Sequence, residues 1–287
     1  FSTMPRFLIC VSLATMGALL VAQTPPAASS SSLPAQSTAI QDVPVPVPKE
    51  IFTTLDKFAH SNWRAVQRSE LSQRKPRGDQ TDLALLLGAV IAEGFIAVEA
   101  EDTVEVKNVG REVAVLARGL GVERAALRRS RAIVEHAENG DWAAVRKEWD
   151  GVQPDVEQGM KELKSERLAQ LVSLAGWLRG TRALSGLILQ SYSEENAALL
   201  RQPALLDHFE SQLNEMPADI RDKPNVTRMR EGIRKIRALL LADEKAISKQ
   251  VVQEIANITE ELLSNLGPKA RKTADFTGSP DCRGRAG

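Results

Sequence analysis

The amino-acid sequence predicts an all-α fold, a multi-helix bundle of about nine helices. Between Glu50 and Gly267, apolar residues recur at steps of three and four positions, and no stretch shows the sustained alternation of a β-strand. With 43% hydrophobic and 26% charged residues, the composition is that of a globular protein and argues against collagen-like, disordered and multi-span membrane chains. Residues 50–267 are therefore expected to form a helical globular domain.

The helix boundaries follow from breakers and capping residues. Asn139 and Gly140 interrupt the helical pattern, as an Asn-Gly turn does. Asp79, Asp102 and Asp141 each stand where a side chain can accept hydrogen bonds from the amides of a first helical turn. The expected helices span residues 50–72, 81–101, 103–118, 122–138, 142–163, 167–190, 194–215, 225–242 and 244–265.

Two of these helices are expected at the centre of the bundle. From Leu83 to Val98 all residues but one are non-polar, and a helix that is apolar all round is buried. The second runs from Leu168 to Leu189 and contains three glycines, which would let a neighbouring helix approach closely. The prediction is that these two helices pack against each other.

A short internal match indicates a duplication. Residues 127–134 resemble residues 233–240 in seven of eight positions by residue class. The match predicts two pseudo-repeated four-helix halves after the first helix, residues 81–165 and 166–267. A chance likeness between two amphipathic basic helices explains it equally well, because helical periodicity constrains residue class.

Glu93 is the one charged residue between Leu83 and Val98 of the first central helix. A carboxylate in apolar surroundings must pair with a cation, take up a proton or bind a ligand. The second central helix offers Arg179 and Arg182, and Arg182 shares an apolar stripe with Leu171 and Leu178. The leading prediction is a structural Glu93–Arg182 ion pair. The alternative is a small polar pocket in which Glu93, Arg179 and Arg182 bind an anionic ligand.

Two further groups of charged residues have a structural and a functional interpretation. The first is a cluster of four acidic residues that could hold a hard cation. Two of its members have a structural explanation, because Asp102 can cap a helix while the side chain of Glu105 bonds back to the cap residue. Two rows of arginines could grip an oxyanion, or form solvated faces paired with acidic neighbours. The cluster is Glu99, Glu101, Asp102 and Glu105, and the rows are Arg124, Arg128 and Arg131, and Arg230, Arg234 and Arg237.

No motif predicts a cofactor, a metal ion or a catalytic residue. His60, His136 and His208 lack the spacing of zinc or di-iron ligands, and neither a phosphate-binding glycine loop nor a serine nucleophile elbow is found. The 37 basic and 37 acidic side chains give a net charge of zero, which argues against a nucleic-acid partner.

The N-terminal residues predict export. Met4, Pro5 and Arg6 precede an apolar run, Phe7 to Ala22, that is short for a membrane span, so residues 1–23 are predicted to be a signal peptide. An uncleaved membrane anchor is the alternative. Residues 24–49, rich in Pro, Ser and Ala, are expected to be a disordered linker, and residues 268–287 a disordered basic tail. The mature chain would retain one cysteine and no internal disulfide.

These features do not specify one function. The preferred expectation is a periplasmic or secreted, non-catalytic binding or structural module of the cell envelope, with an unidentified protein or small-molecule partner. It would contact the membrane only through the signal segment, if that is uncleaved. The alternatives are an enzyme that uses the buried Glu/Arg site on a small anionic substrate, and a haem or metal carrier of the helical-bundle type.

Overall fold

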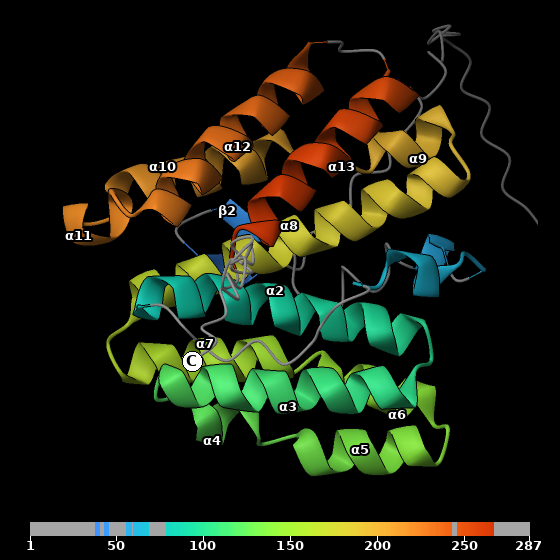
Figure 1. The fold of residues 1–287 in the computed structure, drawn as a ribbon, viewed down its shortest axis with the longest axis vertical. Coiled ribbons are helices and arrows are strands. Elements are labelled where there is room, and N and C mark those ends of the chain that lie inside the picture. Colours follow the sequence, from blue (N-terminus) through green and yellow to red (C-terminus); the bar gives the residue numbers. More distant parts are fainter. Residues whose placement is uncertain are drawn as a thin grey trace, which may run out of the picture. The chain divides into compact units, whose positions relative to one another are not determined.

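The computed structural model describes residues 38–40, 43–45, 56–58, 60–68, 79–242 and 246–266, and within these residues the all-α prediction is confirmed (Figure 1). The predicted signal peptide, most of the expected linker and the basic tail lie outside the described residues. The longer helices are α2 (Gln80–Glu99), α3 (Thr103–Gly119), α7 (Val152–Glu162), α8 (Glu166–Gln190), α10 (Pro203–Glu215), α12 (Pro224–Leu241) and α13 (Lys249–Ser264). The shorter ones are η1 (Asp56–Phe58), η2 (Trp63–Val66), α4 (Glu123–Ala126), α5 (Ser130–Glu138), α6 (Trp142–Trp149), α9 (Glu194–Ala198) and α11 (Ala218–Arg221).

Two three-residue strands stand apart from this helical pattern. They are β1 (Thr38–Ile40) and β2 (Val43–Val45), both within the range expected to be a linker. They pair antiparallel, with Ala39 opposite Pro44.

The two central helices pack against each other as predicted. Helices α2 and α8 form the most extensive contact between helices (Figure 1). At their crossing, a Cβ placed on Gly88 would lie 2.0 Å from the carbonyl oxygen of Val172, and Gly176 faces the carbonyl of Gly88. The two backbones therefore approach more closely than any side chain at residue 88 would permit.

The other helices cover this central pair on two sides. Helices α3, α6 and α7 contact α2, and α5 packs beyond them against α3 and α6. On the far side, α13 packs against α8, α12 against α13, and α10 against α12 (Figure 1). The chain thus builds one side of the bundle before α8 and the other side after it.

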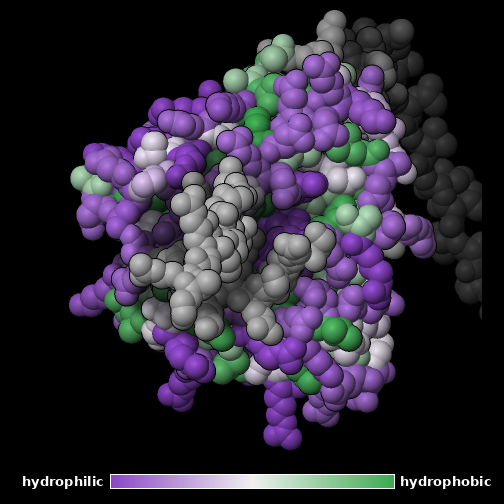
Figure 2. All heavy atoms as spheres, viewed as in Figure 1, coloured by the Kyte–Doolittle hydropathy of each residue, from purple (hydrophilic) through white to green (hydrophobic). Residues whose placement is uncertain are grey.

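Helix α2 is a core helix. Among the described residues it is the helix long and apolar enough to cross a membrane, but 89% of its apolar stretch is buried inside the bundle. On the face drawn in Figure 2, hydrophilic residues predominate and hydrophobic residues form small separate groups. Burial between α3 and α8 accounts for the composition of α2.

The first predicted helix, residues 50–72, is wrong over the residues that the structure describes. These form the 3-10 helices η1 and η2 with a turn between them. The side chain of Asn62 accepts from the amide of Ala65, and the indole N–H of Trp63 donates to the carbonyl of Phe58 at 3.0 Å. These local side-chain bonds favour a turn over a continuous α-helix.

Three further predicted helices are each divided into two. Residues 122–138 form α4 and α5, residues 142–163 form α6 and α7, and residues 194–215 form α9 and α10. The last division occurs because Pro203, which has no amide hydrogen, begins α10.

The other two breaks meet at one arginine. Arg129, in the turn between α4 and α5, donates to Asp155 at 2.9 Å and to Glu148 at 3.1 Å. Gly151, between α6 and α7, leaves room for this guanidinium, since a Cβ there would lie 2.2 Å from it. Hydrogen bonds to Asp155 and Glu148 raise the pKa of Arg129, although burial opposes the rise. The ion pairs thus join the turn between α4 and α5 to both α6 and α7.

The two halves proposed as a repeat, 81–165 and 166–267, place their helices differently around the central one. In the first half α2 packs mainly on α3, the next helix in the chain. In the second half α8 packs mainly on α13, the last described helix. The duplication stays a prediction.

Candidate functional site

The candidate site lies where α2 and α8 meet, around two buried charged side chains. The carboxylate of Glu93 is 0% exposed and the guanidinium of Arg179 is 2% exposed. The Nε and Nη2 atoms of Arg179 each lie 2.6 Å from Oε2 of Glu93. This forked contact joins the two central helices through a charge-assisted pair.

The segment of residues 60–68 closes the site from outside. The carbonyl of Val66 accepts from Nη2 of Arg179 at 2.7 Å, and the backbone amide of Arg68 donates to Oε1 of Glu93 at 2.9 Å. The Arg68 guanidinium adds a longer ionic contact, with Nε 3.8 Å from Oε2 of Glu93. Trp63, at the start of η2, is buried beside α2 and α8. The carboxylate therefore has both oxygens bonded within the protein.

This geometry leaves little room for chemistry at Glu93. A general acid or base must come within hydrogen-bond reach of a substrate. Glu93 is covered by protein groups, and Nη1 of Arg179 is the guanidinium atom left without a partner among the described residues. A buried pair whose carboxylate is bonded in this way fixes how two helices meet, and breaking it leaves an uncompensated charge in the core.

Arg182 does not take part in this site, and the predicted Glu93–Arg182 pair is wrong. Its guanidinium donates to Glu260 of α13 at 2.8 Å, where the two side chains are 31% and 60% exposed. The stripe of α8 that meets α2 runs through Val172 and Gly176, and three residues further on it reaches Arg179. The close approach of α2 and α8 at Gly88 and Gly176 therefore places Arg179, and not Arg182, beside Glu93.

The acidic cluster is held by hydrogen bonds and ion pairs within the protein. Asp102 caps α3 by accepting from the amide of Glu105 at 3.0 Å, as expected, and pairs with Arg64 at 2.8 Å. Glu99 pairs with Arg146 at 2.8 Å. Among the residues that the structure describes, no three His, Cys, Asp or Glu side chains are placed to hold a metal ion.

One of the two arginine rows differs from its predicted form. The row at residues 124, 128 and 131 does not lie on one helix, because the chain breaks between α4 and α5. In the second row, on α12, Arg234 pairs with Glu210 at 2.6 Å and Arg237 with Asp207 at 2.5 Å. The second row is thus paired with the acidic side of α10, in line with the structural interpretation.

His208 is the buried histidine among the three. It lies on α10 against Phe209, is 6% exposed, and its Nε2 has no hydrogen-bond partner among the described residues. Burial lowers the pKa of His208, although the charge of Glu215 opposes this. His208 is therefore held mainly in its neutral form.

Comparison with known proteins identifies no relative. No protein-family model, no curated protein and no solved structure matches the chain. The functional argument therefore depends on the residues themselves. Sequence reasoning found Glu93 and Arg179 but missed the closing segment, since Val66 contributes through its backbone carbonyl and Arg68 through its amide, which any residue but proline supplies.

Proposed function

We propose that the protein is an exported, non-catalytic helical module of the cell envelope that binds a partner or serves a structural role. The observation that carries the non-catalytic part of this proposal is that protein groups cover Glu93 completely. The carboxylate best suited by its position for acid–base chemistry is fully buried and bonded to Arg179 and Arg68. A substrate would have to displace residues 60–68 to reach it.

Export is supported by the sequence. The basic residue Arg6 before the apolar run Phe7 to Ala22, followed by a Pro/Ser/Ala-rich stretch, is the arrangement of a secretory signal and a linker. Such a chain would reach the periplasm or the medium and fold there without a disulfide, by packing alone.

Cell fractionation tests the export part of this proposal. The full chain, with a C-terminal tag, is produced in a bacterium with an envelope, and the mature N-terminus is sequenced. Cleavage near residue 23 and recovery from the periplasm or the medium are expected. A full-length chain in the cytoplasm would overturn this part.

A charge-free core tests the non-catalytic part. In the organism of origin, the double variant Glu93→Leu/Arg179→Met replaces the ion pair with apolar side chains of similar size. If the pair is structural, the variant complements a deletion strain as well as the wild-type protein does, at equal amounts of folded protein. Folded variant that fails to do so, while Arg182→Ala succeeds, would assign chemistry to the pair.

A further inference from the structure

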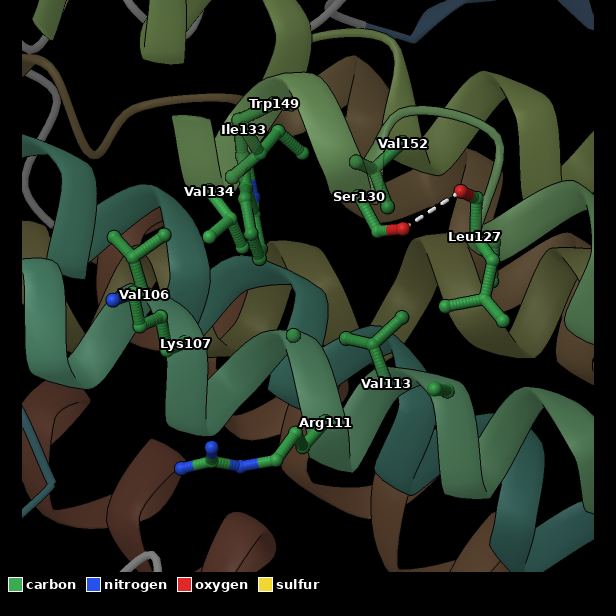
Figure 3. A pocket seen from close by; sticks show the side chains of 13 residues that line it. Val106, Lys107, Arg111, Val113, Leu127, Ser130, Ile133, Val134, Trp149 and Val152 are labelled. Atoms are coloured by element: carbon green, nitrogen blue, oxygen red, sulfur yellow. Dashed lines mark hydrogen bonds between the residues drawn. The ribbon is translucent and has the colours of Figure 1, made fainter. Parts of the chain in front are cut away.

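A second feature, remote from Glu93, is an apolar pocket between α3 and α5 (Figure 3). It has a volume of about 180 Å³. Val106 and Gly110 of α3 form one wall, Ile133 and Val134 of α5 the opposite one, and the indole of Trp149 lies at one end. The pocket is lined mainly by hydrophobic side chains. Those of residues 126–152 come from two segments predicted as longer, unbroken helices, whereas α3 has nearly its predicted bounds.

The pocket exists because the backbone breaks and because its walls carry small residues. The turn at residues 127–129 separates α4 from α5, and Gly110 and Ala126 leave the space between α3 and this turn unfilled. A Cβ placed on Gly110 would meet no atom within 4 Å. A glycine inside a helix is destabilising relative to alanine, and here neither a close contact nor a left-handed backbone requires one. Its effect is to keep the pocket wide.

The polar groups around the pocket are already bonded. The hydroxyl of Ser130 donates to the carbonyl of Leu127 at 2.9 Å (Figure 3). The indole N–H of Trp149 donates to the carbonyl of Ile91 at 3.1 Å. The ammonium of Lys107 pairs with Glu138 at 2.6 Å.

Arg111, the remaining charged residue in the lining, also offers no hydrogen-bond donor to a ligand inside the pocket. Its side chain is directed away from the pocket (Figure 3), and its Nη2 donates to Oδ1 of Asn108. A charged ligand would therefore lose its hydration without gaining a partner inside the pocket.

We propose that this pocket binds a small, uncharged, apolar molecule of about the size of one aromatic ring. Its volume is close to that of an engineered apolar protein cavity of about 150 Å³ that binds benzene. Because the surrounding polar groups already have partners within the protein, the pocket favours a ligand without charge. The exposed side chain of Leu127 extends the apolar surface at the pocket. The proposal deepens the proposed binding function by naming a ligand class, and does not depend on export.

The test uses toluene as the probe and the full chain in solution. Isothermal titration calorimetry should show saturable binding of one toluene per protein. Benzoate and benzylammonium, which add a charge to the same ring, should bind at least tenfold more weakly. Benzoate or benzylammonium binding as tightly as toluene would overturn the assignment of an uncharged ligand.

Two glycine variants locate the binding. Gly110→Leu fills the pocket and should weaken toluene binding at least tenfold. The matched control is Gly180→Leu on α8, where an added Cβ also meets no atom within 4 Å but the residue is not part of the pocket. Circular dichroism verifies that both variants fold. Equal toluene binding by wild type and Gly110→Leu, or no binding by wild type, would overturn the proposal, whereas failure of the export experiment would leave it intact.

Discussion

Helix α8 presents one arginine to each of its two main neighbours, and the two arginines differ in what they stabilise. Arg179 faces α2 and is 2% exposed, and its partner Glu93 is fully buried. Arg182, three residues later, faces α13, and its partner Glu260 is largely exposed. The distances are similar, 2.6 Å and 2.8 Å. Burial, rather than geometry, therefore decides how much each pair matters to the fold.

The largest effect is expected from breaking the buried pair. Arg179→Ala leaves Glu93 charged and without its main partner in the core, which destabilises a protein by about 3–5 kcal/mol. Urea unfolding of wild type and variant measures the difference in the free energy of unfolding. The double variant Glu93→Leu/Arg179→Met is the control and should recover most of the loss. A loss below about 1 kcal/mol in Arg179→Ala would show that the pair behaves like an exposed one.

The next effect concerns the close approach of α2 to α8. Gly88→Ala places a methyl group 2.0 Å from the backbone oxygen of Val172, so the helices must move apart, at a cost of about 1–3 kcal/mol or more. Gly176→Ala, across the same crossing, would place its Cβ at 3.4 Å from the oxygen of Gly88, an ordinary contact. Chemical denaturation should therefore separate the two alanine variants, and equal stability would contradict the description of the crossing.

His208 extends the comparison to a buried ionisable group that has no charged partner bonded to it. Because burial lowers its pKa in the folded state, the unfolded chain takes up the proton first as the pH falls below about 6.5. The stability of wild type should then decrease between pH 7.5 and 5.5 relative to that of His208→Gln. Denaturation curves across this range measure the difference, and a constant difference would mean that His208 does not titrate on unfolding.

The smallest effect is expected at the exposed pair. Arg182→Ala removes a contact that solvent already weakens, so the free energy of unfolding should fall by about 0–1 kcal/mol. The loss should shrink further in 1 M salt, where charges are screened within about 3 Å. A loss as large as that of Arg179→Ala, or one insensitive to salt, would remove the distinction between the two sides of α8.

The sequence predicted the parts of this fold that depend on local pattern. Helices α2, α3 and α8 lie close to their expected bounds, because their periodicity and the caps Asp79 and Asp102 act within one turn. Two of its failures, at residues 60–68 and at Pro203, have local causes, and the others occur where long-range contacts decide. The breaks around Arg129 depend on its ion pairs with Asp155 and Glu148, which no local propensity encodes.

The candidate site shows the same division. An isolated carboxylate in an apolar helix identified Glu93, because burying a charge demands a partner wherever it occurs. Choosing between Arg179 and Arg182 required the rotation of α8 about its axis, which the contact at Gly88 sets. The closing contribution of Val66 is made by its backbone and so left no residue-type signal.

The contacts of residues 60–68 also determine how the bundle would respond to mechanical tension. A pull on the chain ahead of Asn62 would be transmitted first through two hydrogen bonds between the backbone of Asn62 and the side-chain amide of Gln190. It would also act on the buried ring of Trp63. The next element under load is the bond from Arg179 to Val66, which leads into α8, 113 positions further along the sequence. The amide of Arg68 donates to Glu93 on α2, so a force applied at the N-terminal end would be shared between the two central helices, which are the best-buried elements of the bundle.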